Sequence, residues 1–198
     1  MATTQPIRNK QKVREISTYY LKKGHLRNYV LIVLGLHTAL RICDLLRLTW
    51  DDVYDFERGR VRTTFELVEK KTNKSKIIAL NNKAISALTL YAAQAAKSGN
   101  ALILNTITGK SISRIQAYRL IRAAAEALAF EERVSCHSLR KTFGYHAWKG
   151  GASPAVIMDI YNHSSLAVTR RYLGVSQDDK NKVYLGLDYS TECGSSIF

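Results

Sequence analysis

The segment Cys136–Tyr172 reads CHSLRKTFGYHAWKGGASPAVIMDIYNHSSLAVTRRY, and it contains most of the residues that could do chemistry. His137 and Arg140 are three residues apart, so they share one face if this part is helical. His163 precedes Tyr172 by nine residues. Cationic side chains beside a phenol suggest a site that binds a phosphodiester and attacks it with a tyrosine oxygen.

Composition indicates a folded, strongly basic protein. The chain has 198 residues, 46% hydrophobic and 23% charged, which allows one compact domain or two small ones. Its 30 Lys and Arg against 16 Asp and Glu give a net charge of +14. A domain this basic is expected to bind nucleic acid. The alternative is a solvated basic surface without a specific partner.

The cysteines and apolar runs point to the cytoplasm. Cys43, Cys136 and Cys193 are odd in number and form no CxxC pair, which argues against a disulfide framework or a zinc ribbon. The start is basic and polar, unlike a signal peptide, and the apolar run from Tyr29 to Leu36 is too short to span a bilayer. We expect a cytoplasmic, nucleoid-associated protein with no membrane contact.

Periodicity predicts helices in the first forty or so residues. Residues 1–25 are expected to form a basic arm, flexible over about the first ten residues, followed by a short helix from Lys12 to Lys22. A second helix from Leu26 to Ala39 is apolar nearly all round, which predicts a core helix. The segment ICDLLRL continues as a short helix, and TWDDVYDFERGRV reads as a turn-rich passage.

A hairpin and further helices follow. Apolar residues alternate from Val61 to Leu67, and KIIAL (76–80) returns as a second strand, with Lys70, Lys71, Lys74 and Lys76 at or near the turn. Helices are predicted for 82–97 and 113–129, the latter with Ile115, Tyr118, Ile121 and Leu128 inward. Ser153-Pro154 and Ser164-Ser165 are helix starts, and a short helix is expected near 178–184. The predicted fold is α+β: a mostly helical single domain with a small antiparallel sheet.

Tyrosine attack on a phosphodiester sets requirements that this chain meets in order. Arginines can hold the nonbridging oxygens, a base must take the phenol proton, and an acid must protonate the leaving 5′-oxygen. The chain offers Arg41 in GLHTALRICDLLRLTWDDV, Lys71 in the hairpin, HSLRKTF (137–143) and NHSSLAVTRRY (162–172).

These blocks resemble the catalytic domain of the tyrosine recombinases, the phage-integrase family. That family has an Arg, a Lys, a His-x-x-Arg, a His or Trp and a Tyr in this order, and the resemblance spans residues 26–187. It implies a catalytic domain over 26–187, a polar tail over 188–198, and no metal or other cofactor. It also implies a homotetramer on two DNA sites, and a monomer or weak oligomer without DNA.

The resemblance also implies residue roles. Arg41 and Arg140 would hold the phosphate, while Tyr172 would attack it to form a 3′-phosphotyrosine. Lys71 would protonate the leaving oxygen, although Lys70, Lys74 and Lys76 compete for that role. His137 would be the base, His163 would donate a hydrogen bond to the phosphate, and Asp44 would orient Arg41. The predicted DNA-binding residues are Lys70, Lys74, Arg114, Arg119, Arg122, Arg170 and Arg171.

Two features depart from the family pattern. The family usually has Leu-Gly-His where this chain has Tyr161-Asn162-His163, and Asn can adopt the left-handed turn that Gly provides. Most relatives carry an N-terminal DNA-clamping domain, for which residues 1–27 are too few, so the chain is either a short relative or a fragment. A continuous helix would separate His163 from Tyr172 by about 13 Å, so Tyr172 is expected several ångströms out of line without DNA.

Several alternatives remain open at this level. A type IB topoisomerase uses the same chemistry as a monomer, and a non-catalytic DNA-binding regulator could keep the fold and the basic face. Cys136 is rejected as a nucleophile because adjacent residues seldom face one another on a helix. His37 and His146 read as core or surface histidines, and Tyr161, Tyr184 and Tyr189 as packing residues.

Overall fold

The computed structural model describes residues 4–97, 99–173, 181 and 184–186. Its helices are α1 (Lys10–Lys22), α2 (Leu26–His37), α3 (Ile42–Leu45), α4 (Trp50–Val53), α5 (Asn82–Ala95), α6 (Arg114–Ala127), α7 (Cys136–Lys149), α8 (Pro154–Tyr161) and α9 (Leu166–Leu173). Its strands are β1 (Tyr54–Asp55), β2 (Arg60–Val61), β3 (Thr64–Val68), β4 (Ser75–Ala79), β5 (Leu104–Asn105) and β6 (Lys110–Ser111).

The fold is mostly helical, as predicted, and its β structure is divided. Within the described residues the strands form three separate antiparallel pairs, β1-β2, β3-β4 and β5-β6, rather than one small sheet. In the β3-β4 hairpin Phe65 pairs with Ile78, and both side chains are buried. The alternation of apolar residues therefore predicted the buried face of this hairpin correctly.

Helix α2 is the central element of the core. Leu31, Ile32 and Leu34 are completely buried, and the helix packs against α1, α5 and α7. Neighbouring residues point in different directions on a helix, so an apolar run with no polar face needs partners on several sides. The prediction of a core helix is confirmed.

The N-terminal segment is anchored over residues 4–9, where a flexible arm was expected. Ile7 is buried, and its backbone N–H donates to the Thr142 hydroxyl at 2.9 Å. Lys141 donates to the carbonyl oxygen of Thr4 at 2.6 Å. Helix α1 begins at Lys10 because the Asn9 side chain accepts from the first free backbone N–H groups. The expectation of a flexible arm is wrong for these residues, and the division at residue 25 stays a prediction.

Two further local predictions need correction. The passage after Leu48 was expected to be rich in turns, and it does turn at residues 56–59, but it begins with α4, whose capping box joins Thr49 and Asp52. Ile115 was expected to face inward, yet it is 64% exposed. The buried face of α6 is made by Ala117, Ile121 and neighbouring alanines, and Ile115 lies two residues before Ala117, on the opposite side of the helix.

Helices α8 and α9 begin directly after the serine residues that predicted their starts. Ser153 caps α8 with Pro154 at its first position, and α8 ends at Asn162, whose φ of 51° and ψ of 42° are left-handed. This conformation at Asn162 confirms the prediction that Asn replaces Gly there. A turn therefore separates α8 from α9. The helix expected at 178–184 is only partly covered by the described residues, and Tyr189, Cys193 and the tail over 188–198 lie outside them.

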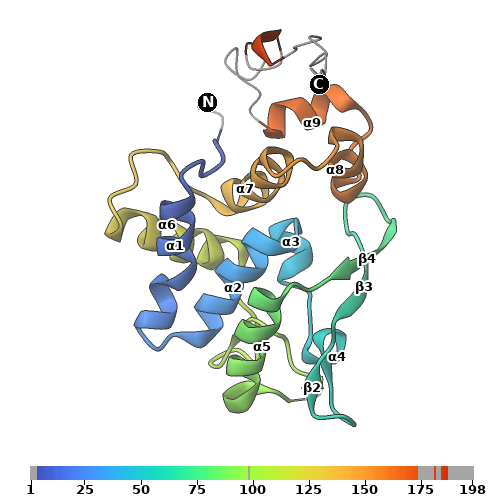
Figure 1. Cartoon of the computed structure of the whole chain (residues 1–198). Coiled ribbons are helices and arrows are strands. Elements are labelled where there is room, and N and C mark those ends of the chain that lie inside the picture. Colours follow the sequence, from blue (N-terminus) through green and yellow to red (C-terminus); the bar gives the residue numbers. More distant parts are fainter. Residues whose placement is uncertain (1–3, 98, 174–180, 182–183, 187–198) are drawn as a thin grey trace, which may run out of the picture.

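Four parts of the chain converge at one end of the molecule. Figure 1 shows α7, α8 and α9 together, with the turn of the β3-β4 hairpin reaching toward α8. The hairpin contacts α8 directly, because Lys76 donates to the carbonyl oxygen of Ile160 at 2.7 Å. Among the described residues no helix has the length and apolar character needed to cross a membrane.

Gly144 on α7 leaves room for Tyr161, which predicts a large effect of adding a methyl group. A Cβ at residue 144 would lie 2.9 Å from the ring carbons Cε2 and Cζ of Tyr161, and closer still to the hydroxyl. We expect Gly144→Ala to lower the free energy of unfolding by about 1–3 kcal/mol, measured by urea denaturation. The cost should be smaller in a Tyr161→Phe background, and an equal cost in both backgrounds would contradict this explanation.

Candidate active site

Two arginines from distant parts of the chain meet at one carbonyl group. Arg41 is the residue that precedes α3, and Arg140 lies on α7 with 1% of its surface exposed. Arg140 donates to the carbonyl oxygen of Tyr161 at 3.0 Å, and Arg41 donates to the same oxygen at 3.5 Å. Arg140 also donates to the carbonyl oxygen of Ala39. The end of α8 and the turn before Arg41 therefore hold both guanidinium groups together.

Tyr161 supports this arrangement with its ring as well as its carbonyl group. The guanidinium carbon of Arg140 lies 4.5 Å from the centre of the Tyr161 ring. The Tyr161 hydroxyl donates to the carbonyl oxygen of Arg140 at 2.6 Å. Burial raises the pKa of Tyr161, which keeps this phenol protonated. Tyr161 packs as predicted, whereas Tyr184 is 75% exposed and was wrongly expected to pack.

A buried glutamate is the acid that contacts Arg41. Glu69 has no exposed surface, and its carboxylate lies 2.8 Å from Nη1 of Arg41. Asp44 was predicted to orient Arg41, but its carboxylate accepts the backbone N–H of Lys70 at 2.9 Å. Asp44 thus holds the hairpin backbone. The sequence signal for Glu69 was the strand alternation itself, because the inward positions that include Phe65 continue to residue 69.

Lys76 is also part of this buried cluster. Its ammonium lies 3.8 Å from Glu69 and donates to Ile160, and 11% of its side chain is exposed. Burial lowers the pKa of Lys76 to about 8, helped by the charge of Arg140. The sequence left Lys76 as a competitor of Lys71 or a simple phosphate contact, whereas in the structure Lys76 docks the hairpin on α8.

The two predicted histidines enclose the predicted tyrosine. The ring centre of Tyr172 lies 5.0 Å from that of His137 and 4.6 Å from that of His163. The Lys141 ammonium lies 5.4 Å from the same ring centre. Tyr172 was expected to lie out of line, because a continuous helix would have kept it far from His163. The turn between α8 and α9 removes that separation.

Both histidines are electrically neutral at physiological pH. Burial lowers the pKa of His137 to about 4, assisted by the charges of Lys141, Arg140, Arg41 and Lys71. Burial likewise lowers the pKa of His163 to about 4, assisted by Arg140 and Arg41. A neutral imidazole has a free lone pair, so it can accept a proton or a hydrogen bond at this pH.

A basic cleft extends from Arg41 along the hairpin turn. It has a volume of about 480 Å³ and is lined by Arg41, Cys43, Leu46, Arg47, Lys70, Lys71, Ile112 and Arg114. Lys71 is exposed there, beside the first residue of α6. The cleft therefore joins one predicted catalytic lysine to two of the predicted DNA-binding residues.

The other predicted DNA-binding residues are more scattered. Lys74, Arg119 and Arg170 are exposed on the hairpin turn, α6 and α9. Arg122 forms an ion pair with Glu126 one helical turn later. The side chain of Arg171 lies outside the described part of the chain.

Cys136 is poorly suited to act as a nucleophile, as expected. Burial raises the pKa of the Cys136 thiol to about 11, so its reactive thiolate is scarce at neutral pH. His37 is engaged with the side chain of Asn81 at 3.0 Å, and His146 with the carbonyl oxygen of Ile7 at 2.9 Å. These contacts are consistent with the interpretation of both as core or surface histidines.

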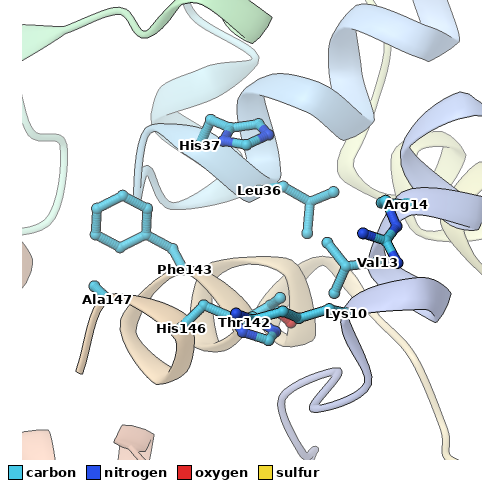
Figure 2. A pocket seen from close by; sticks show the side chains of 9 residues that line it. All are labelled: Lys10, Val13, Arg14, Leu36, His37, Thr142, Phe143, His146 and Ala147. Carbon is cyan, nitrogen blue, oxygen red and sulfur yellow. The ribbon is translucent and has the colours of Figure 1, made fainter. Parts of the chain in front are cut away.

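A separate pocket of about 450 Å³ lies between α1, α2 and α7. Figure 2 shows His37 and Phe143 on one side of it and Val13 and Arg14 on the other. Its lining residues are Lys10, Val13, Arg14, Leu36, His37, Thr142, Phe143, His146 and Ala147. None of them is a predicted catalytic residue, so the chemistry is assigned to the arginine and tyrosine cluster.

The fold and this cluster together define a class of protein. Paired guanidinium groups suit a phosphodiester, and a phenol between two neutral imidazoles suits nucleophilic attack on it. The chain belongs to the phage integrase family, whose family model matches residues 8–178. It is therefore a tyrosine recombinase, of the class of enzymes that cleave and rejoin DNA.

Curated relatives agree with this assignment. The chain is 37% identical over 184 residues to the "Probable integrase/recombinase YoeC" of Bacillus subtilis, covering 93% of this chain and 97% of that protein. It is 28% identical over 166 residues to the "Tyrosine recombinase XerD" of Corynebacterium glutamicum, covering 81% of this chain and 52% of that protein. The chain thus spans nearly all of the first relative and about half of the second.

Solved structures share the fold. A crystal structure of XerA recombinase matches 93% of this chain and 66% of its own with a TM-score of 0.74 and 18% identity. The Tn1549 transposon integrase, in complex with a circular intermediate DNA, matches 94% of this chain and 67% of its own with a TM-score of 0.72 and 19% identity. The catalytic-domain fold is therefore established over the described residues.

The lowered pKa values of the two histidines predict how stability depends on pH. An unfolded imidazole with a pKa near 6.5 binds a proton that the folded site, with a pKa of about 4, does not. Their contribution is therefore complete above pH 6.5 and is lost as the pH falls toward 4. We expect the variant His137→Asn/His163→Asn to lose less free energy of unfolding than wild type between pH 7 and pH 5.

The size of this effect has an upper limit of about 1.4 kcal/mol per pH unit for each histidine. We expect less, because both imidazoles keep contact with solvent. The exposed His25 provides the control, and His25→Asn should leave the slope unchanged. A double variant with the wild-type slope between pH 7 and pH 5 would contradict the assignment of neutral imidazoles at this site.

Proposed function

We propose that this chain recombines DNA at specific sites through a 3′-phosphotyrosine intermediate. The Tyr172 oxygen attacks the scissile phosphorus, the bond to the 5′-oxygen breaks, and a free 5′-hydroxyl leaves. The same step in reverse, with a different 5′-hydroxyl, rejoins the strand. The observation that carries this proposal is the position of the Tyr172 ring, 5.0 Å and 4.6 Å from two histidines, in the cluster that contains both arginines.

Arg41 and Arg140 are proposed to hold the phosphate. Within the described residues, Nε of Arg140 is buried without a hydrogen-bond acceptor. Buried donors without acceptors are costly unless a ligand supplies them. Nonbridging phosphate oxygens have the charge and the geometry to do so, and they gain charge in the transition state.

The histidines and Lys71 are proposed to move or stabilise protons. His137 accepts the phenol proton, which its lowered pKa allows at neutral pH. His163 donates to the phosphate through Nε2–H, in the tautomer whose Nδ1 accepts from the Thr169 hydroxyl at 3.0 Å. Lys71 protonates the leaving 5′-oxygen from the edge of the basic cleft.

DNA is the proposed substrate and partner. The net charge of +14 favours binding to a polyanion, and the cleft that contains Arg41 also contains Lys70, Lys71 and Arg114. The Tn1549 integrase was solved with DNA, which supports the same partner here. We propose that four copies act on two sites in the nucleoid and exchange one pair of strands at a time.

Tyr172→Phe should abolish covalent attachment to DNA. The change removes one oxygen, so binding of a nicked duplex should be retained while the SDS-resistant adduct falls below detection. The duplex would carry a site selected from bound sequences. Tyr145→Phe on α7 is the matched control, because Tyr145 lies outside the cluster and contacts Arg8 and Lys149. An adduct that survives in Tyr172→Phe would show that another residue is the nucleophile.

Lys71→Ala should slow cleavage by about 100-fold, within the usual range for a lost general acid. A substrate with sulfur in place of the bridging 5′-oxygen has a leaving group that needs no acid, so it should restore most of the rate. Lys70→Ala and Lys74→Ala serve as controls on the same turn, and should weaken binding without selective rescue by sulfur. Rescue of Lys74→Ala or Lys70→Ala instead would move the acid to that lysine.

A junction assay separates recombination from the alternatives. With paired sites, a recombinase forms four-way DNA junctions that require Tyr172. Relaxation of supercoiled DNA without junctions would indicate topoisomerase action, and binding without an adduct would indicate a regulator.

A further inference from the structure

Glu69 is a fully buried carboxylate near the predicted site. It has no exposed surface, and it lies at the end of β3, where the hairpin turn begins. Its backbone closes that turn, since its N–H donates to Lys74 at 3.0 Å and its carbonyl oxygen accepts from Asn73 at 2.9 Å. A buried carboxylate is costly without partners, so its contacts indicate what it is for.

The Glu69 carboxylate joins three separate segments. It contacts Arg41 before α3 at 2.8 Å. It accepts a hydrogen bond from the Thr72 hydroxyl at 2.8 Å, within the turn that carries Lys71. It accepts another from the Asn162 side chain at 3.0 Å, at the end of α8. One group thus touches the phosphate-binding arginine, the lysine hairpin and the turn before His163.

Asn162 contributes in two ways that a glycine could not combine. Its left-handed backbone ends α8, and its amide donates to Glu69. Because His163 is the next residue, the hydrogen bond to Glu69 also fixes the start of the segment that carries the histidine. Lys76 adds a second link from the hairpin to α8, through Ile160.

We propose that Glu69 and Asn162 form a positioning pair that sets Arg41, Lys71 and His163 in register for DNA cleavage. Neither residue needs to touch the substrate. The inference rests on the proposed function, because the register matters only if these residues act on one phosphate. Burial raises the pKa of Glu69, but hydrogen bonds from Asn162, Thr72 and Arg41 outweigh it and the net pKa is lowered. The carboxylate therefore stays charged beside the arginine.

The first test distinguishes a positioning role of Glu69 in cleavage from an effect of its charge on DNA binding. Glu69→Gln keeps the shape but removes one negative charge, so DNA binding should be equal or tighter. Single-turnover cleavage of a nicked duplex should nevertheless fall by about 100-fold, as expected for a misplacement of about 1 Å. Glu66→Gln is the matched control, because Glu66 is exposed on the same strand, and its cleavage rate should match wild type.

Variants of Asn162 test the pairing itself. Asn162→Gly keeps the left-handed turn without the amide, and should slow cleavage by about 10-fold. Asn162→Asp places two carboxylates together and should be slower still. The exchanged pair Glu69→Gln/Asn162→Asp restores a donor facing a carboxylate, so it should cleave at least tenfold faster than Glu69→Gln alone. If Glu69→Gln slowed cleavage only by destabilising the fold, the exchanged pair would not restore the cleavage rate.

Three results would overturn the pairing. They are wild-type cleavage by both Glu69→Gln and Asn162→Gly, equal slowing by Glu66→Gln, or an exchanged pair no faster than Glu69→Gln. If Glu69→Gln fails to fold, Asn162→Gly decides alone, and a wild-type rate would overturn the proposal. A failure of the proposed function is distinct, because wild type itself would then form no adduct dependent on Tyr172.

Discussion

The shared hydrogen bonding of Arg41 and Arg140 to the Tyr161 carbonyl oxygen is the constraint on which the rest of the site depends. Arg140 is buried with 1% of its surface exposed, so its charge must be met by fixed protein groups. Those groups are carbonyl oxygens of Tyr161 and Ala39, which lie at the end of α8 and between α2 and α3. Ala39 has a φ of 56°, an unusual conformation for a residue with a Cβ. The backbone is bent where the arginine needs an acceptor.

This concentration of positive charge determines the electrostatics around it. Arg140 and Arg41 help to lower the pKa values of His137 and His163 to about 4, and the pKa of Lys76 to about 8. Neutral imidazoles can serve as a base and a hydrogen-bond donor at physiological pH. A bound anion would relieve the same repulsion among cations, which supports the proposed binding of phosphate. Glu69 supplies a buried negative charge that keeps Arg41 in place meanwhile.

Much of this arrangement could be predicted from the sequence, because the helices and the motif order follow local rules. Ser153 and Pro154 predicted where α8 begins, and Asn162 predicted the left-handed turn that follows it. The missed features depend on tertiary contacts. Lys76 looks like any other hairpin lysine until α8 packs beside it. Glu69 continues the inward alternation of its strand, but only the folded chain shows that Arg41 lies opposite it.

The separation expected between His163 and Tyr172 is not observed, for a geometric reason. Helical spacing gives a distance only if the helix is continuous, and residues 163–165, between His163 and the start of α9, are not helical. For Asp44, the spacing in sequence predicted a contact with Arg41. In the structure its carboxylate instead accepts a hydrogen bond from the backbone N–H of Lys70. Spacing therefore predicted which residues belong to the site, and the fold determined which of them touch.

Mass-spectrometric mapping of the covalent complex would test the central claim most directly. Wild-type protein would be trapped on a nicked duplex and digested with protease and nuclease, and the peptide that retains a nucleotide would be sequenced. The account predicts a nucleotide joined through its 3′-phosphate to Tyr172. A nucleotide on any other residue, or a 5′-phosphate linkage, would contradict it.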